Sequence, residues 1–324
     1  MTSYRDAGVD LNGASKHVAS ISEEVRSTWT ESVVGAFGGF AAGVEIPPGY
    51  DNPVLMMSTD GVGTKLDLAR RVDAWGGVGA DLVAMCVDDL AAVGAKPLGF
   101  VDYLAVGSLQ TERDTAIVKS IARACREAGC ALLGGETAVH PGVMEPDAVD
   151  LAGAVMGVVE KGDELGPHLV RDGDVIVGLL SPNLRSNGFS LVRVVFGDEL
   201  DQYAESLLDP SVIYSPAVLQ AVSTGGVHAA AHITGGGIAE NLGRVVPESL
   251  GAIIDTSAWQ TPPVFDLVSD RGVSQDEMFR TFNMGVGFCL VIDSNALDDA
   301  AAAVGQHDPT VIGRITTGNG VHLS

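Results

Sequence analysis

The amino-acid sequence predicts an α/β protein of two domains, each built from a mixed sheet packed with helices. Its 324 residues are many for one compact domain, which favours two. Hydrophobic residues make up 46% of the chain, enough for a substantial core in each half. In both halves, short apolar runs typical of strands also alternate with segments typical of helices.

The first half contains four apolar runs that we interpret as strands, and two segments that we interpret as helices. A Thr-Glu-Arg-Asp sequence at residues 111–114 resembles a capping box, so the second helix is expected to begin there and to stop near Gly129. The first helix is expected at residues 79–95, and the strands at residues 54–58, 97–106, 130–135 and 151–160.

A polar, turn-rich segment at residues 161–174 separates the two halves. We place the domain boundary within it, which gives an N-terminal domain of residues 1–162 and a C-terminal domain of residues 163–324. The second half is again α/β. Its strands are expected at residues 175–180, 252–257, 287–293 and 310–316, and its helices at residues 191–196, 238–246 and 296–305.

The formal net charge of −23 argues against nucleic acid and anionic membranes as partners, because no broad basic footprint is present. A phosphorylated small molecule is compatible with this charge, since backbone N–H groups and a metal ion can hold it. The chain starts without the apolar core of a signal peptide, and no apolar run reaches the roughly 18 residues of a membrane span. We expect a soluble, cytoplasmic protein with reduced cysteines.

The first candidate site is the loop Asp60-Gly61-Val62-Gly63-Thr64-Lys65, which follows an expected strand. Glycines let the backbone approach a ligand, and loop N–H groups can hold phosphate oxygens. Lys65 would add a positive charge, and Asp60 could hold a metal ion. The spacing is not that of a Walker A loop, and an ordinary turn is the alternative.

Two adjacent carboxylates, Asp88 and Asp89, interrupt the apolar helical segment at residues 79–95. A buried carboxylate without a partner is costly, so a partner is expected. Mg²⁺ is one candidate, because it prefers oxygen ligands and often joins carboxylates to ATP phosphates. The alternatives are that this face meets solvent or that an arginine pairs with it.

Four further segments carry candidate binding residues. One follows a buried strand, at a position where ligands often bind in α/β sheets: Gly135, Glu136 and Thr137. Another precedes an expected helix, where exposed N–H groups can bind an anion or where the side chains can simply cap the helix: Ser186, Asn187 and Gly188. A run of three glycines and one turn complete the set: Thr234, Gly235, Gly236 and Asn283.

Taken in this order, the segments resemble the phosphoribosylformylglycinamidine cyclo-ligase family, also called aminoimidazole ribonucleotide synthetases. The similar segments are SYRDAGVD, GAFGGF, STDGVGTKL, GADLVAMCVDDL, GAKPL, GCALLGGETA, SNGFSLVR, AHITGGGIAENL, RVVP, MFRTFNMGVG and IGRI. Each is weak alone, but eleven of them in one order are specific and extend over nearly the whole chain.

The resemblance implies a homodimer of two-domain α/β subunits that converts formylglycinamidine ribonucleotide and ATP to aminoimidazole ribonucleotide, ADP and phosphate, with Mg²⁺. On this basis we assign catalytic roles to Lys65, Asp60 and Asp88, and metal binding to Asp60, Asp88 and Asp89. Nucleotide or phosphate binding falls to Gly61, Gly63, Thr64, Gly135, Glu136 and Thr137. Substrate binding falls to Ser186, Asn187, Gly188, Thr234, Gly235, Gly236 and Asn283.

The chain departs from the family pattern at three places. Residues 29–32 replace a basic Arg-Arg-Pro stretch, Val139 stands where a glutamate is common, and Arg185 stands where a histidine is common. These departures bear on how substrate phosphate and the ATP tail are held. The alternatives are another ATP-using member of the superfamily, or a catalytically weakened nucleotide-binding paralogue.

Overall fold

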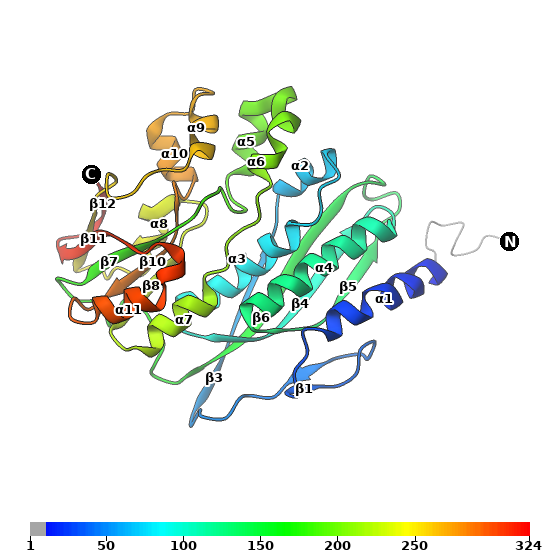
Figure 1. The fold of residues 1–324 in the computed structure, drawn as a ribbon, viewed down its shortest axis with the longest axis horizontal. Coiled ribbons are helices and arrows are strands. Elements are labelled where there is room, and N and C mark those ends of the chain that lie inside the picture. The colour runs from blue at the N-terminus through cyan, green and yellow to red at the C-terminus, as the bar shows by residue number, and fades with distance from the viewer. Residues whose placement is uncertain (1–10) are drawn as a thin grey trace.

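A computed structural model describes residues 11–324, so the SYRDAGVD segment that contributes to the resemblance lies outside the described residues. The chain forms a four-stranded sheet followed by a six-stranded sheet, each covered by helices (Figure 1). The predicted fold class is confirmed. The proposed boundary at residue 162 falls between the last strand of the first sheet and the first strand of the second. None of the described helices is long and apolar enough to cross a membrane.

The first sheet has the strand order β3-β6-β4-β5. Strand β6 is antiparallel to both of its neighbours, while β4 and β5 are parallel. A two-stranded hairpin of β1 and β2 precedes this sheet in the chain. The strands are β1 (Val33–Val34), β2 (Gly43–Val44), β3 (Pro53–Gly61), β4 (Lys96–Val106), β5 (Ala131–Val139) and β6 (Val149–Glu160).

Helices α1 (Leu11–Arg26), α3 (Val78–Ala92) and α4 (Thr111–Ala128) cover one face of this sheet (Figure 1). Gly79 lets α3 and α4 pack closely, because a Cβ atom there would lie 2.2 Å from the Ile121 nitrogen. Helix α4 begins at Thr111 as predicted, but the expected capping box is not formed: the residue before the helix is Gln110, whose backbone N–H donates to the Asp114 carboxylate. Helix α4 ends as predicted at Gly129, which has a left-handed φ of 72°.

The opposite face of the four-stranded sheet carries exposed apolar side chains. Met57 of β3 is 74% exposed, and Leu55, Val101 and Tyr103 are each between 44% and 49% exposed. No described helix of this chain covers that face (Figure 1). It is therefore a candidate surface for association.

The second sheet has the order β12-β9-β11-β7-β10-β8 and separates two cores. Alternate residues of β10 contribute to each core, with Leu290 in one and Val291 in the other, as the two-residue period of a strand requires. The strands are β7 (Val175–Leu180), β8 (Val227–His232), β9 (Leu250–Ile254), β10 (Val286–Ile292), β11 (Thr310–Thr317) and β12 (Gly320–Leu323).

Helices cover both faces of the second sheet, and a separate apolar cluster joins α5, α9 and α10 beside it. The α-helices not yet named are α2 (Lys65–Arg71), α5 (Phe189–Phe196), α6 (Ala204–Leu207), α7 (Ser215–Ser223), α8 (Gly237–Gly243), α9 (Pro263–Ser269), α10 (Gln275–Thr281) and α11 (Leu297–Ala303). Helix α3 contacts α7 and β8, so it is packed between the two domains.

Candidate functional site

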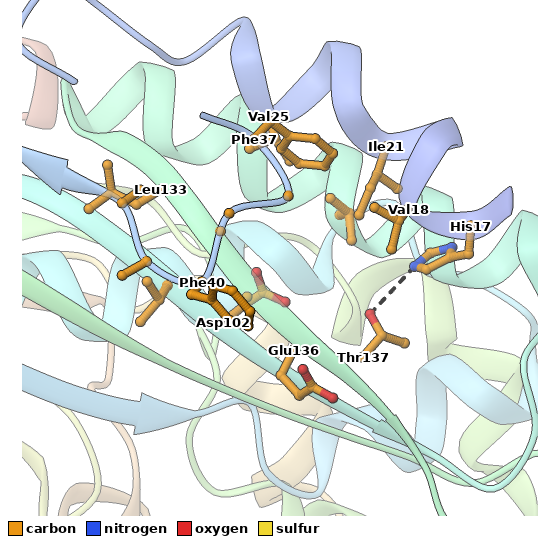
Figure 2. A pocket seen from close by; sticks show the side chains of 18 of the residues that line it. His17, Val18, Ile21, Val25, Phe37, Phe40, Asp102, Leu133, Glu136 and Thr137 are labelled. Carbon is orange, nitrogen blue, oxygen red and sulfur yellow. Dashed lines mark hydrogen bonds between the residues drawn. The ribbon is translucent and has the colours of Figure 1, made fainter. Parts of the chain in front are cut away.

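A cavity of about 700 Å³ lies at the edge of the first sheet. Its walls are helix α1, the glycine-containing loop at residues 36–42, and strands β4 and β5 (Figure 2). Val18, Ile21 and Phe37 give it an apolar side. The volume and mixed lining are typical of a small-molecule site. We call it the β5 cavity.

Asp102 of β4 lines the β5 cavity and faces Gly135 of β5. A Cβ atom on Gly135 would lie 2.3 Å from an Asp102 carboxylate oxygen, so the glycine leaves room for that side chain. Burial raises the pKa of Asp102 to about 7, because the charged form loses its hydration. Glu136, next to Gly135 in the chain, is the second carboxylate of the cavity (Figure 2).

His17 of α1 lies on the other side of the β5 cavity, close to Thr137 (Figure 2). Its Nε2 atom is 3.5 Å from the Thr137 hydroxyl, and the residue is only 2% exposed. Burial lowers the pKa of His17, although the charge of Asp114 opposes this effect. No lysine or arginine is among the described residues that line the cavity. A phosphate there would depend on backbone N–H groups and a metal ion.

The cavity brings together the predicted residues Gly135, Glu136 and Thr137. Sequence analysis missed His17 and Asp102. The sequence held a signal for Asp102, because it is the one charged residue in the apolar strand expected at residues 97–106. His17 offered none, since a single histidine on a helix has no distinctive spacing.

A second cluster of polar side chains lies where the two domains meet. We call it the junction site and define it as Ser58, Asp60, Asp89 and His232. Asp89 accepts hydrogen bonds from the Ser58 hydroxyl at 3.0 Å and from His232 Nδ1 at 2.9 Å. These bonds to Asp89 outweigh its burial and lower its pKa. The pKa of Asp60 is raised by burial and by the neighbouring charge of Asp89, against a hydrogen bond from the Gly61 N–H.

The junction site and the β5 cavity are linked through the sheet. Asp60 of β3 and Asp102 of β4 both pair with Gly153 of the strand between them. Two strand spacings separate their backbones by about 10 Å. Asp60 and Asp89 belong to the predicted metal site, and the structure places them near each other.

The loop after β3 contacts the second domain beside the junction site. The Ser186 hydroxyl donates to the Val62 carbonyl at 2.9 Å, and the hydroxyls of Thr64 and Ser190 are 3.2 Å apart. Gly63 has a left-handed φ of 68°. Several predicted residues therefore meet at the domain contact. Their ligand roles, and that of Gly61, stay predictions.

The predicted catalytic role of Lys65 is corrected, because its side chain is buried and bonded within the protein. The side chain is completely buried, and its ammonium lies 2.8 Å from Asp81. It also donates to the carbonyl oxygens of Arg185 and Asp209, at 3.0 Å each. With its donors directed at these groups, Lys65 joins the two domains and is not available to a phosphate.

The catalytic and metal-binding roles predicted for Asp88 are corrected as well. Arg185 Nη2 lies 2.6 Å from one Asp88 oxygen, and both side chains are fully buried. The other oxygen accepts the backbone N–H groups of Tyr214 and Ser215. The alternative of an arginine partner is the one that the structure supports.

Two other predicted substrate residues have contacts within the fold. Asn283 is 2% exposed and bonds to the Asn183 carbonyl and the Gly285 N–H. Gly188 has a left-handed φ of 78° and packs against Phe282. The prediction for Asn283 is corrected to a structural role, while a ligand role for the Gly188 backbone stays a prediction.

Gly236 also has a left-handed φ, of 97°, and lines a separate cavity of about 580 Å³ beside Glu240 and α10. Its neighbour Gly235 has space around its Cβ position, with Asn187 the nearest group at 4.0 Å. Thr234 is 3.3 Å from the Asn241 side chain. Of the three-residue glycine run, Gly235 is therefore the residue best placed to accommodate a ligand.

The described residues include no group of three His, Cys, Asp or Glu side chains placed to hold a metal ion. Mg²⁺ commonly binds through one or two carboxylates together with substrate phosphates and waters. The Asp60 and Asp89 pair, with one Asp60 oxygen bonded only by a neighbouring N–H, fits such a partial site. The four cysteines are buried and free, as expected.

The fold and its two polar sites define a two-domain α/β protein with a ligand-sized cavity at a sheet edge and an acidic site at the domain contact. The chain belongs to the AIR synthase related protein family. The N-terminal domain model of that family matches residues 40–159, and the C-terminal domain model matches residues 171–324.

Solved structures share this fold at low sequence identity. Thiamine-monophosphate kinase from Stenotrophomonas maltophilia K279a superposes with a TM-score of 0.67 at 19% identity, covering 94% of this chain and 96% of that one. Hydrogenase maturation protein HypE in complex with ATP gives a TM-score of 0.68 at 19% identity, covering 96% and 91%. T. maritima PurL complexed with AMPPCP gives 0.59 at 16% identity, covering 96% of this chain and 47% of that one.

Proposed function

We propose that this protein is a phosphoribosylformylglycinamidine cyclo-ligase, acting in the cytoplasm in purine biosynthesis. The observation that carries the proposal is the meeting of the motif segments in space. The segments around Asp60, Asp89, Ser186 and His232 come together at the domain contact. The GAFGGF and GGETA segments line the β5 cavity.

The β5 cavity is the proposed site of ATP. Its volume suits a nucleotide, its apolar side can contact a base, and the glycines on both walls let phosphate oxygens approach the backbone. Two similar folds carry nucleotides in their solved structures, ATP in HypE and AMPPCP in PurL. Asp102 and Glu136 line the same cavity and could hold a metal ion that accompanies the phosphates.

Asp60 and Asp89 are the residues that would hold Mg²⁺ at the junction site. When bound, Mg²⁺ neutralises charge on the transferred phosphoryl group. Asn187 and Gly235 are proposed to contact the ribonucleotide substrate, because the Cβ position of Gly235 is open and the Asn187 side chain, at 4.0 Å, is the nearest group to it.

The chemistry assigned to this chain is positioning and exclusion of water. Phosphoryl transfer from ATP to the substrate amide oxygen makes an iminophosphate, which turns a poor leaving group into phosphate. The amidine nitrogen then attacks the same carbon, the ring closes, and phosphate leaves. Because this attack is intramolecular, holding the substrate in a folded conformation contributes much of the rate.

A homodimer is proposed from the exposed apolar face of the first sheet. Met57, Leu55, Val101 and Tyr103 form this face, and a second copy would remove it from water. The β5 cavity includes Val101, so the proposed interface adjoins the nucleotide site.

The test is ADP release from Mg-ATP, measured with formylglycinamidine ribonucleotide and with thiamine monophosphate in parallel. The proposal predicts release that depends on the ribonucleotide and needs no ammonia donor. Release with thiamine monophosphate alone would assign the protein to another branch of its superfamily. Nucleotide binding without turnover of either compound would favour the paralogue that has lost activity.

A further inference from the structure

One hydrogen bond in the junction site crosses from the second domain to the first. His232, the last residue of β8, lies 2.9 Å through Nδ1 from Asp89 of α3. The histidine side chain is 3% exposed, while that of Asp89 is 45% exposed. A buried group of one domain thus contacts an accessible carboxylate of the other.

The partner of each ring nitrogen indicates which nitrogen of His232 is the donor. An ionised carboxylate only accepts hydrogen bonds, so Nδ1 carries the proton. Nε2 is buried without a hydrogen-bond partner among the described residues. A ring whose hydrogen is on Nδ1 leaves no buried N–H unpaired. The ring also lies nearly parallel to Phe288, with centroids 6.0 Å apart, which fixes its plane.

Asp89 is therefore held from two sides. His232 donates to one carboxylate oxygen and Ser58 donates to the other. Each oxygen keeps a lone pair, and Asp60 is the neighbouring charge. This arrangement fixes the carboxylate in orientation without neutralising it, which is what a ligand for a cation requires.

We propose that His232 is a positioning residue that orients Asp89 for divalent-cation binding. The proposal rests on the cation site assigned above to Asp60 and Asp89. It gives β8 of the second domain a direct role in a site whose carboxylates both belong to the first domain.

A matched pair of variants isolates the donated hydrogen bond. Leu and Asn are similar in size, and both remove the imidazole ring. Asn can place its amide N–H near the former Nδ1 position, whereas Leu has no donor. The measurement is Mn²⁺ binding to the purified full-length protein without nucleotide, followed by the electron paramagnetic resonance of free Mn²⁺.

His232→Leu is expected to weaken Mn²⁺ binding by about 10-fold or more, as is typical when the hydrogen-bond partner of a metal ligand is lost. His232→Asn is expected to restore affinity to within about threefold of the native protein. Asp89→Asn should weaken binding at least as much, and adding His232→Leu to it should cost little more, because both changes act on one interaction.

His228 supplies the control for general effects of removing a buried histidine. It lies on the same strand, is 8% exposed, and contacts Asp174 at 2.8 Å. His228→Leu should leave Mn²⁺ affinity unchanged. Should His232→Leu unfold the protein, His232→Gln provides a second variant, since its amide reaches the Nε2 position and not Nδ1.

Equal affinity in His232→Leu and the native protein would overturn the proposal. So would equal loss in His232→Leu and His232→Asn, an equal loss in His228→Leu, or a native protein that shows no saturable Mn²⁺ binding. The expected Mn²⁺ pattern in a protein that does not turn over the ribonucleotide would support the role of His232 while contradicting the proposed reaction.

Discussion

Arg185 of the second domain and Asp88 of helix α3 form an ion pair of 2.6 Å in which both side chains are fully buried. Arg185 also donates to the carbonyl oxygens of Gly287 and Val212. Arg185 is the residue that departs from the His-Ser-Asn-Gly pattern of the similar family. Its pairing with Asp88 accounts for that departure by a structural role.

Asp88→Asn should destabilise the protein by roughly 3–5 kcal/mol, because a buried guanidinium loses its countercharge. Urea unfolding measures this change. Asp89→Asn is the control, since the exposed neighbour should alter stability little. A normal urea midpoint for Asp88→Asn, together with a changed Mg²⁺ requirement, would restore the metal role.

Lys65→Met should also destabilise the protein, because Asp81 would be left buried without its cation. The expected loss of stability is again several kcal/mol. Turnover per folded molecule, measured at low temperature where the variant is folded, should stay within a few-fold of the native value. A loss of 10²-fold or more in a fully folded variant would return Lys65 to catalysis.

Asp102 should make the ligand-free protein less stable as the pH rises. Its pKa is about 7 in the folded protein and near 3.9 when unfolded. Between these pH values the folded state keeps a proton that the unfolded state has released. The stability that protonated Asp102 contributes is therefore fully present below about pH 4 and is lost by about pH 7. The slope is at most about 1.4 kcal/mol per pH unit.

Asp102→Asn removes that titration. The free energy of unfolding of the variant, relative to the native protein, should therefore increase from pH 5 to pH 7.5. Chemical denaturation at several pH values measures it. A constant difference across this range would show that Asp102 is not titrating there.

Gly235→Val should weaken substrate binding while leaving the melting temperature nearly unchanged, because its Cβ position is open and its φ is not left-handed. Gly236→Val supplies the contrast. Its φ of 97° strains any side chain, so that variant should lose stability first. Substrate titrations and thermal melts of both variants check the pair, and a Gly235→Val variant that binds normally would remove Gly235 from the site.

Met57→Glu should convert the proposed dimer to monomers, since it replaces the most exposed side chain of this apolar face with a charge. Val194→Glu, at a position that is 78% exposed on α5, is the matched control. Sedimentation velocity measures whether each variant is a dimer or a monomer. A native protein that is monomeric at micromolar concentration would contradict the proposed dimer.

The fold was predictable because its signals are local. Apolar runs predicted the four strands of the first sheet and four of the six strands of the second, but not β8 or β12, and Gly129 predicted the end of α4. The face to which a carboxylate points is decided by distant residues. Asp88 and Asp89 are adjacent, yet one meets Arg185 and the other His232, at separations of 97 and 143 residues.

Lys65 illustrates the same limit. Its glycine-rich context is typical of phosphate loops. Its donors are used by Asp81 and by the carbonyl groups of Arg185 and Asp209, which only the tertiary structure brings to it. Asp102 was open to prediction as a charge within an apolar strand. The cavity it lines was not, because α1 and the loop at residues 36–42 meet β5 only through tertiary structure.

The most direct test of the central claim is product formation from formylglycinamidine ribonucleotide and Mg-ATP by the purified protein. Aminoimidazole ribonucleotide and ADP should appear together, one molecule of each per turnover, and neither should form when the ribonucleotide is omitted. ADP release without the imidazole product, or no release from a folded protein that binds ATP, would contradict the account.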